Sequence, residues 1–229
     1  MKPIRSVIDG IECLTITRPH AKKTVMLLHG FGADMNDLAP LHSYLDPKGI
    51  FNWVFPNGIQ EVPIGPHVTG KAWFPIRMAD IEAAAMRGDV VDFAEVFPDG
   101  MAEAEGRIKS LIENLRIDLN DLILGGFSQG AMMTCQVALT LPTDVCGMIL
   151  FSATTINLKV WEREAPRHSA IPFIQSHGKE DPILGFSHAE RLYSILSACG
   201  LKGRFLPFQG FHEIPLPVIR EATRFLEAL

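Results

Sequence analysis

Residues 122–131 read Leu-Ile-Leu-Gly-Gly-Phe-Ser-Gln-Gly-Ala, and this stretch decides the fold. It holds the pattern Gly-x-Ser-x-Gly, with Ser128 at its centre. Residues 121–125 predict a buried strand, and residues 130–141 predict a helix that ends before a proline. A strand, a tight turn and a helix in this order are typical of a nucleophile elbow, in which the turn lifts the serine oxygen above a sheet.

The residue types around this serine meet the physical demands of such an elbow. Glycine two positions before the serine and two positions after it lets the strand and the helix approach each other without Cβ clashes. The N-terminus of the helix adds partial positive charge where an oxyanion would form. A glycine-rich turn with an incidental serine is the competing interpretation, and the flanking strand and helix favour the nucleophile.

Apolar runs and helix-like segments alternate along most of the chain. The predicted strands are residues 24–29, 52–55, 121–125, 148–151, 171–175 and 204–208. The predicted helices are residues 37–45, 130–141, 187–199 and 217–229, and residues 91–115 are expected to be mostly helical. Nearly continuous apolar strands separated by helices indicate a mainly parallel central sheet with helices on both faces. We expect one α/β domain over residues 1–229.

Residues 57–89 interrupt this alternation. The segment is rich in proline and glycine and carries an aromatic pair, Trp73 and Phe74, followed by another proline. A connection of this length inside a compact domain is usually functional or poorly ordered. We therefore expect a long loop here.

Composition weighs against several classes of function. A net charge of −5 argues against nucleic acid or an anionic membrane as the main partner. No apolar stretch approaches the roughly 20 residues of a membrane span, and residues 1–10 hold no apolar core of a secretory signal. The four cysteines form no Cys-x-x-Cys pair, so we expect four free thiols and a location in the cytoplasm, a reducing compartment.

A serine hydroxyl needs a base to take its proton, and the chain offers histidines for this role. In folds with such an elbow the order along the chain is serine, acid, histidine, which leaves His168, His177, His188 and His212. His168 precedes any suitable acid, and His188 falls inside a predicted helix. His177 follows a predicted strand, where a histidine can also be structural. His212 lies between the last strand and the last helix, so it is the expected general base.

The acid is expected in the loop after the strand 171–175. Asp181 lies there and is followed by Pro182, which favours an extended backbone at the aspartate. Glu180 is the adjacent rival carboxylate. The order of the motif and the loop position favour Asp181, whose role would be to accept the imidazole Nδ1–H and stabilise the imidazolium.

An oxyanion hole needs two backbone N–H donors. One is expected from Gln129, directly after the nucleophile, and the other from Phe31, in the loop His-Gly-Phe-Gly-Ala at residues 29–33. A phosphate-binding loop is the alternative for this glycine-rich segment, but both the P-loop and the Gly-x-Gly-x-x-Gly patterns are absent. No His-Glu-x-x-His motif or Cys/His cluster is present either, so we expect no metal and no organic cofactor.

Four segments together resemble the phospholipase/carboxylesterase family, which includes acyl-protein thioesterases, lysophospholipases and bacterial carboxylesterases. They are residues 29–33, 126–131, 177–182 and 210–213. The resemblance spans nearly the whole chain and implies an α/β-hydrolase fold. It also implies hydrolysis of carboxylic esters through a Ser-His-Asp triad and an acyl-enzyme.

The resemblance has consequences for substrate contacts. Trp73 and Phe74 are similar to a Trp-Phe feature near the family's active site, which predicts that they line the acyl side of the cleft. An aromatic pair that pins a long loop to the core is the alternative. The family commonly carries Val-Pro shortly after the Asp-Pro, whereas residues 183–186 here read Ile-Leu-Gly-Phe. Leu184 is therefore expected in a pocket wall of different shape.

The natural substrate is left open at this point. Residues 33–37 are more similar to bacterial carboxylesterases than to animal thioesterases, so short- to medium-chain esters are expected, with thioesters and lysophospholipids as further options. A peptidase of the same fold is one alternative, although no charged anchor for a peptide terminus is evident. A catalytically inactive binding protein is another, but no triad residue is missing. We expect a monomer or a homodimer that acts on a small-molecule ester.

Overall fold

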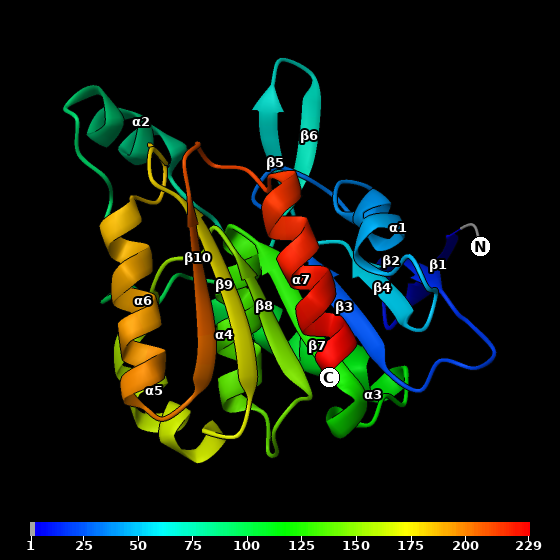
Figure 1. Ribbon diagram of the computed structural model, residues 1–229. Helices are drawn as coiled ribbons and strands as arrows, with labels where there is room; N and C mark the ends of the chain where they lie inside the picture. Colours follow the sequence, from blue (N-terminus) through cyan, green and yellow to red (C-terminus); the bar gives the residue numbers. More distant parts are fainter. Residues whose placement is uncertain (1–2) are drawn as a thin grey trace.

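The computed structural model describes residues 3–229, with the side chains of Met78 and Ala85 outside the described part. An eight-stranded sheet with the order β1-β2-β4-β3-β7-β8-β9-β10 forms its centre (Figure 1). Its strands are β1 (Ile4–Ile8), β2 (Ile11–Ile16), β3 (Thr24–Leu28), β4 (Asn52–Pro56), β7 (Leu122–Phe127), β8 (Gly147–Phe151), β9 (Pro172–Gly178) and β10 (Lys202–Phe208). From β4 to β10 all neighbours are parallel, whereas β1 and β2 are antiparallel to each other and β2 to β4.

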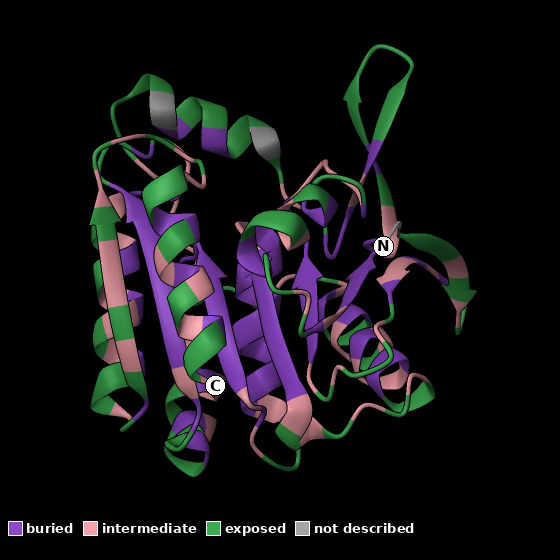
Figure 2. Cartoon of the chain, turned by 45° about the vertical axis from the view of Figure 1, so that its right-hand side comes forward, coloured by how far each residue is buried: buried purple, intermediate pink, exposed green. Residues whose placement is uncertain are grey.

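Helices cover both faces of this sheet. They are α1 (His42–Leu45), α2 (Met78–Met86), α3 (Met101–Asn114), α4 (Gln129–Thr140), α5 (Leu158–Glu164), α6 (Phe186–Ala198) and α7 (Leu216–Ala228). Successive strand residues face opposite sides, so Leu122 and Leu124 pack with α3 to α6, whereas Ile123 packs with α1 and α7. Figure 2 shows the buried strands between helices whose outer faces are exposed. The mainly parallel sheet with helices on both faces is confirmed.

The predicted strands all exist, with ends displaced by at most three residues. The predicted helix 37–45 is instead a 3-10 turn, Ala39–Leu41, followed by the single turn of α1. In the segment 91–115 only α3 is helical. Gly100 precedes it in the left-handed region at φ 80°, and Pro98 lies just before, so the helix cannot extend backwards.

The prediction of a long loop at residues 57–89 is wrong over much of the segment. It contains an antiparallel hairpin of β5 (Gln60–Gly65) and β6 (Val68–Ala72), and then α2. The hairpin projects from the body of the protein, and most of its residues are exposed (Figures 1 and 2). Because it buries so little, it lacks the alternation of apolar and polar residues by which strands are recognised.

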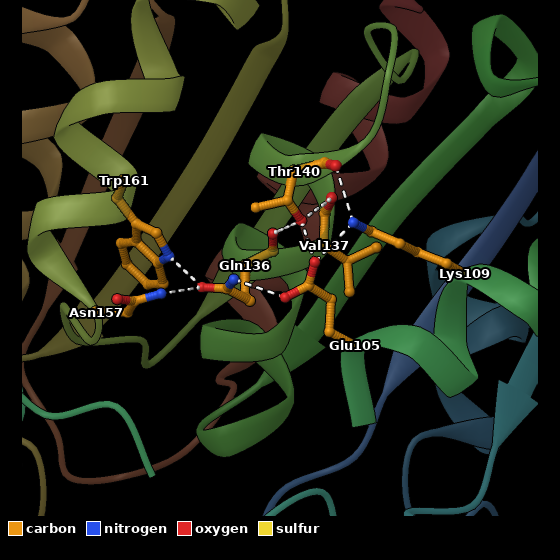
Figure 3. Close-up of polar contacts among 7 residues, drawn as sticks. All are labelled: Glu105, Lys109, Gln136, Val137, Thr140, Asn157 and Trp161. Carbon is orange, nitrogen blue, oxygen red and sulfur yellow. Dashed lines mark hydrogen bonds and ion pairs between the residues drawn. The ribbon is translucent and has the colours of Figure 1, made fainter. Parts of the chain in front are cut away.

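A buried polar network joins α3, α4 and α5 (Figure 3). Gln136 on α4 donates to Glu105 on α3 at 2.7 Å and accepts from Trp161 on α5 at 2.9 Å and from Asn157 at 3.0 Å. Burial raises the pKa of the Glu105 carboxyl, but its hydrogen bonds, led by that from Lys109, outweigh this effect and lower the pKa overall. The network fixes α4, whose first turn follows Ser128.

In the part of the chain that the structure describes, no helix combines the length and the apolar character needed to cross a membrane.

Candidate active site

Ser128 lies at the carboxyl end of β7 and immediately before α4. Its backbone has φ 56° and ψ −121°, a conformation that non-glycine residues adopt only when the surroundings hold them there. A Cβ on Gly126 would lie 2.4 Å from the carbonyl carbon of Gly130, and a Cβ on Gly130 would lie 2.0 Å from the Leu28 oxygen. Both glycines are therefore required by close backbone packing at the turn.

His212 and Asp181 form a hydrogen-bonded pair. His212 Nδ1 lies 2.6 Å from Asp181 Oδ2, and Asp181 Oδ1 accepts the backbone N–H groups of Ile183 at 2.8 Å and Leu184 at 3.0 Å. Burial alone would raise the pKa of the Asp181 carboxyl, but the imidazoles of His177 and His212 outweigh it and hold the pKa well below its usual range. The carboxylate is thus ionised and fixed in orientation.

The sheet brings these two residues together from distant parts of the chain. Asp181 follows β9, and His212 lies between β10 and α7, so both occupy the edge of the sheet at which parallel strands end. The two loops are in close contact, because a Cβ on Gly178 would lie 2.1 Å from the Phe211 oxygen. Glu180 donates its backbone N–H to Gly210, and its side chain is exposed.

The competing histidines are absent from the lining of the cavity that contains Ser128. His168 Nδ1 pairs with Asp144 at 2.8 Å, and His188 lies on α6. His177 is fully buried at the end of β9, with Nε2 3.1 Å from Asp181 Oδ2. Of these histidines, it is His212 that lines a cavity together with Ser128.

The cavity at Ser128 has a volume of about 380 Å³ and a mostly apolar lining. Phe31 and Leu184, two of the predicted site residues, lie in its wall. Its other apolar side chains are Ala33, Ile76, Ile81, Phe127, Met132 and Ile183. The Phe127 ring also packs against the imidazole of His212, with ring centroids 4.7 Å apart. The serine and the histidine therefore open onto a space suited to an apolar group.

A second apolar cavity of about 340 Å³ adjoins the first. The two share Ile76 and Ile81, the latter from α2. Phe74 lines this second cavity and not the one at Ser128. Sequence reasoning missed Ile76 and Ile81, because they belong to the segment expected to be a loop and match no motif.

Trp73 lies behind the site and is completely buried. Its indole Nε1 donates to the His29 oxygen at 2.9 Å, and its backbone N–H donates to Gln129 Oε1 at 2.9 Å. Gln129 Nε2 in turn donates to the Phe74 oxygen at 2.7 Å. Neither ring of the aromatic pair lies in the wall of the Ser128 cavity, and Trp73 instead joins the loop 29–33 to the start of α4.

Strand β6 holds the same loop from its other side. Gly32 donates its N–H to the Lys71 oxygen, and Lys71 donates to the Ala33 oxygen, both at 2.8 Å. A Cβ on Gly70 would lie 1.9 Å from the Gly32 oxygen, so only glycine fits there. The backbone that carries the Phe31 amide is therefore fixed before any substrate binds.

His29 is buried in this loop as a neutral imidazole. Its Nε2 accepts the Gly58 N–H at 2.8 Å, and its Nδ1 lies 2.8 Å from the Gly30 oxygen, to which it donates. Burial lowers the pKa of His29. Protonation would place a second N–H against that of Gly58, so the loop geometry depends on the neutral form.

No group of three or more His, Cys, Asp or Glu side chains suited to holding a metal ion occurs in the described residues.

Comparisons with known proteins identify the family of the chain. The family model described as Phospholipase/Carboxylesterase matches residues 11–229. Acyl-protein thioesterase 1 of Mycosarcoma maydis is 27% identical over 213 residues, which is 90% of this chain and 88% of that protein. The acyl-protein thioesterase 1 of Saccharomyces cerevisiae is 27% identical over 192 residues, covering 77% of this chain and 78% of its own.

Solved structures show the same fold. The crystal structure of esterase PE8 has a TM-score of 0.75 and 25% identity, covering 100% of this chain and 99% of that one. Zea mays acyl-protein thioesterase 2 has a TM-score of 0.72 and 22% identity, covering 94% and 97%. The chain therefore belongs to the phospholipase/carboxylesterase family and is an α/β-hydrolase of the carboxylesterase type.

Proposed function

We propose that this chain hydrolyses carboxylic esters through Ser128 as nucleophile, His212 as general base and Asp181 as the acid that orients the base. One observation carries the proposal. The 2.6 Å contact between His212 Nδ1 and Asp181 Oδ2 directs the other ring nitrogen, Nε2, away from the acid. His212 and Ser128 line the same cavity. This is the division of roles found in a Ser-His-Asp triad.

In the first half-reaction Ser128 Oγ attacks the ester carbonyl carbon while His212 Nε2 takes the hydroxyl proton. The carbonyl oxygen becomes an oxyanion, for which the backbone N–H groups of Phe31 and Gln129 are the proposed donors. As the bond to the alcohol breaks, His212 gives its proton to the leaving oxygen, and the acyl group remains on the serine. A water molecule then repeats the sequence and releases the acid.

We further propose that the acyl group occupies the apolar space beside Ser128. Medium-length chains would continue past Ile76 and Ile81 into the adjoining cavity, because these two side chains form the boundary between the spaces. Each buried CH₂ contributes about 0.8 kcal/mol, so kcat/KM should rise by roughly fourfold per added carbon until the space is filled. Thioesters and lysophospholipids present the same acyl chemistry to this site.

A series of nitrophenyl esters from acetate to palmitate tests the proposal. We expect hydrolysis by the unaltered protein and none by Ser128→Ala, with kcat/KM rising and then levelling at a definite chain length. Ile81→Trp, which obstructs the boundary between the two cavities, should shorten the acyl chain at which kcat/KM levels. It should leave kcat/KM for the acetate ester unchanged. Absence of ester hydrolysis by the folded protein would contradict the proposal.

A further inference from the structure

We propose that His177 is a positioning residue that shares Asp181 with His212 and keeps the general base active at lower pH. The inference rests on the proposed function, because it assigns a role within the same triad. It concerns a side chain that touches neither the cavity nor the serine.

The geometry around Asp181 is the first argument. His177 Nε2 and His212 Nδ1 lie 3.1 Å and 2.6 Å from the same atom, Oδ2. The other carboxylate oxygen accepts two backbone N–H groups, from Ile183 and Leu184. The side chains of His177 and Asp181 are both completely buried. Two backbone N–H groups and two imidazole nitrogens thus lie around one carboxylate.

The protonation state of His177 follows from its surroundings. A bare Nε2 facing a carboxylate oxygen would set two lone pairs against each other, so Nε2 carries the hydrogen. The 3.1 Å contact of Nε2 with Oδ2 is not aligned for a full hydrogen bond, and within the described residues neither ring nitrogen has a hydrogen-bond partner. A second proton on Nδ1 would bury an unpaired donor. The imidazole is therefore neutral, with its hydrogen on the side of Asp181.

Sharing the carboxylate changes what Asp181 does for His212. Part of the negative charge on Oδ2 is already engaged by His177, so it stabilises the His212 imidazolium less than an unshared carboxylate would. A less stabilised imidazolium loses its proton at lower pH. We therefore expect the activity that depends on His212 to extend to lower pH with His177 in place than without it.

Other ionisable groups lie near His212 and Asp181, and they are unaltered in the His177 variants. Asp37 lines the cavity that His212 also lines. Lys179, Glu180 and Glu213 are exposed in the two loops that carry the acid and the base. No hydrogen bond or ion pair joins these four side chains to His177.

Helix α6 packs against β9 and presents the ring of Phe186 to His177, with centroids 6.4 Å apart. The charged residues of this helix are Glu190 and Arg191, and Arg191 pairs with Asp92.

Two substitutions of His177 distinguish the effect of its N–H donor from the effect of its side-chain volume. His177→Leu removes the N–H, whereas His177→Gln retains a donor at the position of Nε2. We expect the acid limb of the kcat/KM profile for a nitrophenyl ester to move up by about 0.5 to 1 pH unit in the leucine variant, and to return toward the original in the glutamine variant. His168→Leu, which breaks the buried contact to Asp144 far from the cavity, is the matched control and should leave the limb in place.

A second readout does not depend on hydrolysis. The proton between His212 Nδ1 and Asp181 should give a downfield NMR resonance that shifts in His177→Leu and is restored in His177→Gln. Identical profiles and resonances in all variants would overturn the inference, as would equal changes in both His177 variants accompanied by equal loss of melting temperature. If the unaltered protein shows the resonance and its response but no ester hydrolysis, the proposed function fails and the shared carboxylate stands.

Discussion

Trp73 donates its indole N–H to the backbone oxygen of His29 at 2.9 Å, which ties a completely buried ring to the loop that carries the Phe31 amide. The same tryptophan is held by Gln129, the residue whose amide is the second proposed oxyanion donor. Trp73 thus connects the loop 29–33, through its indole N–H, with the side chain of Gln129, through its backbone N–H. The resemblance predicts a substrate contact at Trp73, whereas its ring lies outside the wall of the Ser128 cavity and holds the backbone behind it.

Replacing Trp73 by Phe should lower kcat by about tenfold. The change keeps an aromatic ring but leaves the buried His29 oxygen without its donor, which costs about 1–3 kcal/mol and loosens the loop. Because the ring is outside the cavity wall, the loss should be equal for all acyl lengths, with KM unchanged. Steady-state kinetics on short and long esters measure this.

Trp161→Phe is the matched control for that experiment. Its indole N–H donates to Gln136 at 2.9 Å, in the network about two turns further along α4 than Gln129 (Figure 3). Trp161→Phe also loses one buried indole hydrogen bond, so its melting temperature should fall while kcat stays within about twofold of the unaltered protein. A loss that grows with acyl length in Trp73→Phe would instead place the ring in the substrate pocket.

Asp181→Asn should leave the fold intact and lower turnover by about 10⁴, because an amide at this position favours the wrong imidazole tautomer. Glu180→Gln alters the adjacent carboxylate, which is exposed, and should change turnover by less than about threefold. Parallel kinetics on the two variants, with circular dichroism to verify folding, decide between the carboxylates. The opposite pattern would make Glu180 the acid.

The stability of the protein should fall as the pH drops below about 6.5, in part because of His29. Burial lowers the pKa of His29 in the folded state, so the unfolded chain takes up the proton first and is favoured as the medium becomes acidic. Above the ordinary histidine pKa both states are neutral at this residue, and its stabilising contribution is complete. One such group adds a slope of up to about 1.4 kcal/mol per pH unit to the free energy of unfolding.

Urea unfolding at several pH values isolates this contribution. His29→Gln keeps an acceptor for the Gly58 N–H but cannot be protonated, so its free energy of unfolding should depend less steeply on pH than that of the unaltered protein. His20→Gln, at an exposed histidine, should leave the slope unchanged. Equal slopes in all three proteins would show that His29 does not resist protonation.

The alternating core of the fold was predictable because burial on both sides of the sheet leaves a strong apolar signal. Strands such as β7 and β8 consist almost entirely of buried residues, and the glycines around Ser128 are required by contacts of 2.0 to 2.4 Å. The exposed elements were not predictable in the same way. The hairpin of β5 and β6 depends on backbone pairing with little burial, and β1 pairs at the sheet edge with alternate residues in solvent.

Candidate site residues could be predicted where a residue type is tied to a motif, but not where only the fold brings residues together. Asp181 and His212, 31 residues apart, meet because β9 and β10 are parallel neighbours. Nothing in the sequence marks Ile81 as part of a cavity wall, because its position depends on how α2 packs over the site. The location of Trp73 likewise follows from three-dimensional hydrogen bonds rather than from spacing.

The most direct test of the central claim is covalent labelling with a fluorophosphonate, which reacts with a serine activated by a neighbouring base. In the unaltered protein we expect stoichiometric modification that peptide mass spectrometry maps to Ser128. We expect no labelling of Ser128→Ala and strongly slowed labelling of His212→Ala. Labelling that persists in Ser128→Ala, or that maps to another serine in the unaltered protein, would contradict it.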